Sequence, residues 1–193
     1  MWLPLRSCLV TCIGSTLLSG VTSAQASVQS TVSAVSPAGA ALAGSIALSI
    51  GSGAVQSLGN VTDNVANTFP SPVSITLTWD LHPSTGSVQV IGYFANPAAA
   101  MTSGPVSIPS SWLRGRVLTT GAQGAPTTYT EFTQGGGGVG TAGGSLLLLT
   151  VPVLGYSKAG TQTIDLQLQL DLTGRVLAAG AYSGTLNIRA VTQ

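Results

Sequence analysis

The chain has 193 residues, of which six are Lys or Arg and five are Asp or Glu, while 44% are hydrophobic and 25 are glycine. Because a nucleic-acid-binding surface needs clustered Lys and Arg, this composition excludes a basic nucleic-acid binder. The sequence holds a single His, a single Lys and a single Glu, so few side chains could catalyse a reaction. We therefore expect no enzyme, no catalytic residue and no cofactor.

The first 26 residues have the organisation of a secretory signal. Arg6 is followed by an apolar run from Cys8 to Val21, and Ala24 and Ala26 supply the small side chains that signal peptidase needs. The apolar run is too short for a membrane span, which takes about 20 residues. We expect cleavage near Ala26 and a protein that is secreted, periplasmic or on the cell surface.

Cleavage there would remove both cysteines, Cys8 and Cys12. The mature chain would then have no disulfide, no thiolate metal ligand and no Cys nucleophile. Lipidation of Cys12 is the alternative, although the preceding Thr11 is not the small residue that usually stands there. The mature chain would carry five basic and five acidic side chains and no membrane span.

Residues 27–44 are mostly Ser, Ala, Thr, Val and Gly, with one Pro and no charge, which predicts a flexible N-terminal arm. Residues 45–193 are long enough for a single domain with its own core. In this part apolar and polar residues alternate with the period of half-buried strands. The predicted strands are 46–50, 55–65, 73–80, 88–94, 112–119, 127–132, 146–153, 164–172 and 182–191.

The segment from Ile164 to Leu172 is the clearest strand, because five aliphatic side chains share one parity and every polar side chain has the other. Short intervals with Pro and Gly separate the strands, which is typical of an antiparallel sandwich and not of βαβ units. The four leucines from Leu146 to Leu149 favour a strand buried on both faces. We predict an all-β, antiparallel immunoglobulin-like sandwich of eight or nine strands, with loops at 97–101 and at the glycine-rich 135–144.

Several catalytic or metal-binding patterns can be weighed against this fold. The glycines from Gly138 to Gly143 match a dinucleotide fingerprint, but a strand and not a helix follows them. Asp165 and Asp171 lie six residues apart on one strand face, about 20 Å at ~3.3 Å per residue, which is too far for a glycosidase pair. A cross-strand pair of Asp80 and Glu131 stays open. A Ser-His-Asp triad would need the sole His, His82, but the sequence has no Gly-x-Ser-x-Gly turn to present the nucleophile. No metal-binding pattern is present.

Trp112 is the one aromatic residue beside cations, because Arg114 and Arg116 follow it. An exposed indole beside guanidinium groups could contact a ligand or a partner, while packing in the core is the ordinary alternative. These three residues are the candidate contact site.

The C-terminal segment from Leu177 to Val191, with a small-Gly-x-Tyr turn before an alternating strand, resembles the closing strand of bacterial fimbrial and spore coat U-like subunits. The resemblance implies an incomplete sandwich whose groove is filled by a strand from a chaperone or from the next subunit. Residues 27–44 would be the donor arm. The absence of cysteines from the mature chain departs from the disulfide of many pilins.

These observations together predict a secreted or surface-displayed structural subunit, with copies of itself or a periplasmic chaperone as partners and no nucleic acid. The alternative is a carbohydrate- or protein-binding sandwich module with an aromatic platform around Trp112.

Overall fold

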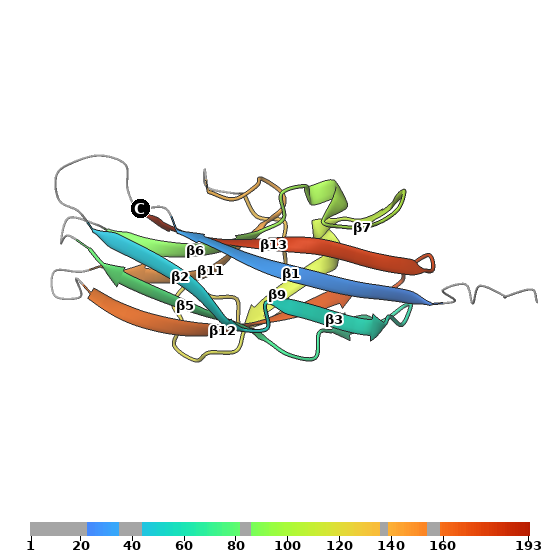
Figure 1. Cartoon of the computed structure of the whole chain (residues 1–193), viewed down its shortest axis with the longest axis horizontal. Helices are drawn as coiled ribbons and strands as arrows, with labels where there is room; N and C mark the ends of the chain where they lie inside the picture. The colour runs from blue at the N-terminus through green and yellow to red at the C-terminus, as the bar shows by residue number, and fades with distance from the viewer. Residues whose placement is uncertain (1–22, 35–43, 82–85, 136–138, 154–158) are drawn as a thin grey trace, which may run out of the picture.

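The computed structural model describes residues 23–34, 44–81, 86–135, 139–153 and 159–193. Within these ranges the chain is all-β, and two sheets face each other (Figure 1). Sheet A runs in the order β11 (Ser145–Pro152), β6 (Ser87–Tyr93), β13 (Gly180–Thr192), β1 (Ala24–Ala34) and β3 (Val55–Asn60), with β7 (Met101–Ser103) on β13 and β8 (Val106–Ile108) on β7.

Sheet B runs in the order β10 (Thr130–Glu131), β9 (Leu113–Val117), β12 (Ala159–Asp171), β5 (Val73–Asp80) and β2 (Ser45–Ser52), with β4 (Ala66–Thr68) on β12. Two 3-10 turns, η1 (Pro97–Ala99) and η2 (Ser110–Trp112), lie in the connections. No helix in these ranges is long and apolar enough to cross a membrane.

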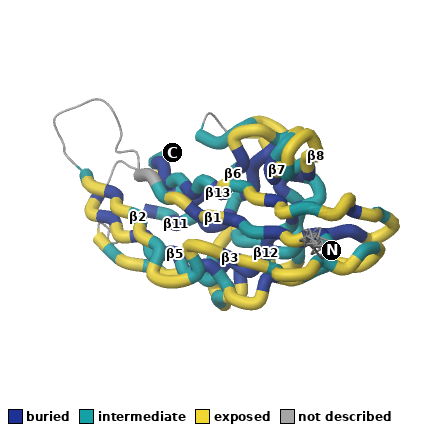
Figure 2. The backbone as a smooth tube through the Cα atoms, turned by 45° about the vertical axis from the view of Figure 1, so that its right-hand side comes forward, coloured by how far each residue is buried: buried dark blue, intermediate teal, exposed yellow. Residues whose placement is uncertain are grey.

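The period of the sequence places the core between the sheets. On β12 the side chains of Ile164, Leu166, Leu168 and Leu170 are buried, and on β13 those of Tyr182, Leu186, Ile188 and Ala190 are buried. The prediction of two-faced strands over 164–172 and 182–191 is confirmed in both cases. Figure 2 shows the same alternation of buried and exposed positions along the sheets.

Phe132 fills the middle of the core. Its ring meets Phe94 edge-on, with the ring centroids 5.2 Å apart. A Cβ atom added to Gly92 of β6 would lie 3.3 Å from this ring, and so would one added to Gly115 of β9. The two glycines therefore make the room that the phenyl ring occupies between the sheets.

The largest departure from the sequence prediction is β1. Residues 27–34 were predicted to belong to a flexible arm, but they are strand, and the strand begins earlier, at Ala24. Ala24, Ala26 and Val28 are buried in the core. Small side chains suffice here because backbone pairing on both sides, to β13 and to β3, holds the strand. Residues 35–43 of the predicted arm lie outside the described part.

The predicted antiparallel pairing also needs one correction, because β1 runs parallel to β13. All other strand pairs are antiparallel. The described strands number thirteen and not eight or nine, since several have only two or three residues. One of the loops predicted between strands, 97–101, contains the turn η1 and the start of β7.

Three predicted strands are shorter than expected, and one of them, 112–119, is strand only over Leu113–Val117. The segment 55–65 ends as a strand at Asn60, because the Asn67 side chain bonds Thr62 and Val65 and turns the chain back. The segment 127–132 is strand only at Thr130–Glu131. In β11 the four leucines span a register shift between Leu147 and Leu149, so three of them are buried and Leu147 is half-buried.

Candidate functional site

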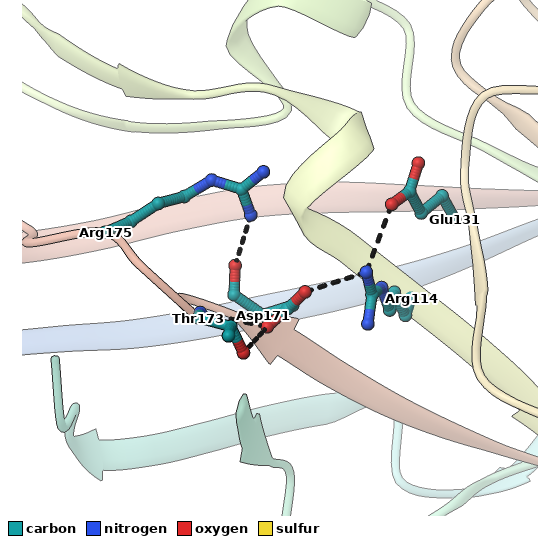
Figure 3. Close-up of polar contacts among 5 residues, drawn as sticks. All are labelled: Arg114, Glu131, Asp171, Thr173 and Arg175. Carbon is teal, nitrogen blue, oxygen red and sulfur yellow. Dashed lines mark hydrogen bonds and ion pairs between the residues drawn. The ribbon is translucent and has the colours of Figure 1, made fainter. Parts of the chain in front are cut away.

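The predicted contact residues lie on η2 and β9, where Arg114 joins two carboxylates. Its Nη2 atom lies 2.8 Å from Asp171 Oδ2 and 3.2 Å from Glu131 Oε1 (Figure 3). Asp171 ends β12, and Glu131 lies on β10, so the ion pairs join three strands of sheet B on its outer face. The Asp171 side chain is almost fully buried, while Arg114 and Glu131 are about a third and two fifths exposed.

The Asp171 carboxylate has all of its partners within the chain. Oδ1 accepts hydrogen bonds from the Thr173 hydroxyl, at 2.6 Å, and from the Thr173 backbone N–H, at 3.0 Å. These bonds, and after them the charges of Arg114 and Arg175, hold the pKa of Asp171 below its usual value, although burial works in the opposite direction. The carboxylate is therefore a fixed anchor for the turn that follows β12.

Trp112 and Arg116 have partners that the sequence did not reveal. The Arg175 guanidinium lies 4.8 Å from the centre of the Trp112 ring, and Arg175 Nη1 also donates to the Asp171 backbone carbonyl. The Arg116 guanidinium lies 4.5 Å from the centre of the Tyr129 ring. Each of the three predicted residues thus has an intramolecular cation–π or ionic partner.

This arrangement is one of structural contacts more than of a ligand site. The partners of these three residues lie 13 to 63 positions away in the sequence, so no local sequence pattern predicts them. They are Glu131 and Asp171 for Arg114, Tyr129 for Arg116 and Arg175 for Trp112. The Nε atoms of Arg114 and Arg116 are buried without a hydrogen-bond partner, so the guanidinium groups are positioned by their other atoms.

The other chemical candidates are not brought together. Asp80 lies on β5 and Glu131 on β10, with β9 and β12 between them, so the open pairing of these two carboxylates does not occur. His82 and Gly138 lie outside the described residues. Among the residues described, no three His, Cys, Asp or Glu side chains gather at one place.

A second candidate site is β1 itself. It pairs with β13 from Ala24 opposite Gly180 to Ala34 opposite Ala190, and with β3 from Gln25 opposite Asn60 to Gln29 opposite Val55. Beyond the ladders, the Ser30 N–H donates to Ala54 and the Val61 N–H donates to Ala24, at 2.7 and 2.8 Å. Figure 1 shows the first strand beside the last.

The inner face of β1 has one poorly matched position. Val28 is fully buried and Val32 is half-buried against the core. Ser30, between them, is 5% exposed, and its hydroxyl has no hydrogen-bond partner. An unpaired buried hydroxyl costs free energy that an apolar side chain would not, so the slot between β13 and β3 would accommodate a more apolar strand.

Shallow hollows of about 290, 230 and 130 Å³ lie along sheet A, the first and third bordered by β1, β3 and β13 and the second by β13 and the segment 94–102. They share lining residues, since Ser183, Gly184 and Thr185 border the first two and Ser27 borders the first and the third. Their polar side chains are neutral, with Gln25, Gln29, Asn96 and Asn187 as the amides.

A scan against protein-family models and a search of curated proteins found no match to this chain.

Proposed function

We propose that the protein is a secreted or surface-displayed structural subunit without enzymatic activity that assembles with copies of itself by β-strand addition. The observation that carries the proposal is β1. It is the first described strand of the chain, it is paired on both sides, and only residues 35–44 separate it from β2. A terminal strand of this kind can leave its own sheet and occupy the same slot in another copy with the same contacts.

Removal of the predicted signal would favour such an exchange. Cleavage after Ala26 would take away two buried side chains, Ala24 and Ala26, and the three register pairs with Gly180, Ala181 and Tyr182. The shortened strand would keep Val28, Ser30 and Val32 on its inner side. A subunit in this state has part of its slot open to a strand from a neighbour or from a periplasmic chaperone.

The proposed class of fold is an immunoglobulin-like sandwich. Two features support this class beyond the presence of two sheets. The Tyr182 hydroxyl, at the start of the last strand, donates to the Ala178 carbonyl four residues upstream at 3.0 Å, as in a tyrosine corner. The segment 45–60 moves from sheet B to sheet A at Gly53, whose φ is +73°, a corner at which a strand changes sheets.

Light scattering and negative-stain electron microscopy test the proposal. We compare the chain that begins at Ser27 with one that begins at Ser45 and lacks the strand. Rods or ladders from the first chain only, and binding of a synthetic 27–34 peptide by the second, are the expected results. Two identical, stable monomers that ignore the peptide would overturn the proposal.

A second candidate function, binding of a neutral glycan, is favoured by the amide-lined hollows on sheet A. Uncharged amides and hydroxyls suit sugar hydroxyl groups, which are neutral donors and acceptors. Glycan-array binding that is lost in Thr185→Lys and kept in Trp112→Ala would place the ligand on sheet A. Binding that is lost in Trp112→Ala alone would place it at the platform predicted from the sequence.

A further inference from the structure

The two lateral sides of the sandwich differ in how their strand edges are covered. On the side of β9 and β11, the chain between these strands bonds to both edges. The Val117 N–H donates to Pro126, and the Thr150 N–H donates to Gln123, at 2.7 and 2.8 Å. The Leu147 N–H donates to the Gln134 side chain at 2.8 Å. The outer edges of both sheets are therefore satisfied from within the chain.

The opposite side of sheet B ends at β2, which pairs with β5 alone. Among the residues described, no loop or side chain donates to or accepts from the outer edge of Ser45–Ser52. Every second residue of an edge strand turns its N–H and C=O groups away from the sheet. With respect to the described part of the chain, the edge of β2 is thus an open row of donors and acceptors.

The sequence of this edge carries none of the usual protection. Residues 45–60 contain no charged residue and no Pro, whereas natural edges are commonly blocked by Lys, Pro or a bulge. The one irregularity of β2 lies between Ile50 and Ser52, at its far end. The stretch from Ser45 to Ile50 is left as a regular, uncharged ladder.

The inner side of β2 is also only partly covered. Ile46 is buried, but Leu48 and Ile50 are half-buried, although all three point toward the core. Ala47 and Ser49 are exposed on the opposite face. Two of the three inward-facing apolar residues of β2, Leu48 and Ile50, therefore keep part of their surface uncovered.

We propose that β2 pairs antiparallel with β2 of a second copy about a two-fold axis, so that sheet B continues across the two molecules. An axis at Leu48 sets Ile46 opposite Ile50 of the other copy, and Leu48 opposite itself, so the half-buried side chains cover one another. Neither edge carries a charge that would repel the other. The inference rests on the proposed function, because it names a second surface by which the subunits meet, separate from the β1 slot.

Lysines on the exposed face of β2 test this contact, since Ala47 would lie opposite Ser49 of the other copy. We compare the secreted chain with its Ala47→Lys/Ser49→Lys variant by sedimentation equilibrium over a range of concentrations. Two lysine pairs facing each other across the contact should weaken dimerisation at least about tenfold. High salt should restore part of the loss.

A charge exchange makes the test specific. Ala47→Glu/Ser49→Glu should also be monomeric, and a mixture of the Lys and Glu variants should form a heterodimer. The matched control, Thr128→Lys/Thr133→Lys, places two lysines at exposed positions on the covered side and should dimerise as the unaltered chain does. Thermal unfolding of each variant shows that the fold is kept.

The outcomes separate this inference from the proposed function. An unaltered chain that stays monomeric up to its solubility limit, or a dimer that ignores both charge variants, overturns pairing through β2. Rods that persist in the Lys variant would keep strand addition through β1 and reject the β2 contact. Charge-sensitive dimers without rods would keep the β2 contact and reject strand addition through β1. If the edge bound an unrelated strand instead, the mixture of Lys and Glu variants would not form a heterodimer.

Discussion

Asp171 is held as a carboxylate by Thr173 and Arg114, and its pKa is lowered in the folded chain. A carboxylate with a lowered folded pKa stabilises the fold above the ordinary carboxyl pKa of about 4, and this contribution is lost as the pH falls through the folded pKa. We expect Asp171→Asn to cost roughly 1.5–3 kcal/mol near neutral pH, the range for hydrogen bonds to a charged group.

Urea unfolding at several pH values checks this prediction. The free energy of unfolding of the unaltered chain should begin to fall below about pH 5 and should continue to fall through the lowered folded pKa of Asp171, and that of Asp171→Asn should fall less. Asp165→Asn is the control, because the Asp165 side chain has no ion pair within the described ranges. Equal pH dependence in all three proteins would contradict the role assigned to Asp171.

Gly115 illustrates a second constraint at the scale of one residue. A Cβ atom here would lie 3.0 Å from the side chains of Leu146 and Leu166, which are both buried. Gly115→Ala should therefore destabilise by about 1–3 kcal/mol through overpacking. A Cβ atom on the exposed Gly135 would meet nothing within 4 Å, so Gly135→Ala should unfold at nearly the same urea concentration as the unaltered chain.

Among the elements, β1 allows the clearest prediction, because two neighbouring substitutions in it should differ strongly in their effect on the free energy of unfolding. Val28 is fully buried and its neighbour Gln29 is exposed. Val28→Asp would bury an unpaired carboxylate and should destabilise the chain by roughly 3 kcal/mol or more. Gln29→Asp should change the free energy of unfolding by less than about 0.5 kcal/mol. Chemical unfolding of both variants measures the difference, and two similar small effects would mean that β1 adds nothing to the core.

The elements also show what the sequence could and could not predict. Strands such as β5 and β12 were predictable, because alternation records which face meets the core. β1 was not, because Ala24, Ala26 and Ser30 face inward with little apolar volume and the strand is held by backbone pairing to distant segments. The candidate site is similar in this respect: the sequence pointed to Trp112, Arg114 and Arg116, but their intramolecular partners come from other strands and turns and could not be predicted.

On the scale of the whole molecule, the small number of charges predicts a weak response to salt. In the part of the chain that is described, ion pairs occur only around Arg114. The free energy of unfolding should change by less than about 0.5 kcal/mol between about 0.02 and about 0.5 M sodium chloride. Unfolding curves at the two salt concentrations test this, and a large stabilisation by low salt would reveal electrostatic contacts beyond this cluster.

The pairing of β1 with β13 joins residues as far apart as Thr31 and Asn187, which lie 156 positions from each other. Contacts of such long range raise the contact order of a chain and slow its folding. The segment around Ala24 is synthesised early, yet its parallel neighbour β13 is the last of the described strands to be synthesised. β1 must therefore wait for β13, and this part of sheet A can close only after residues 180–192 have been made.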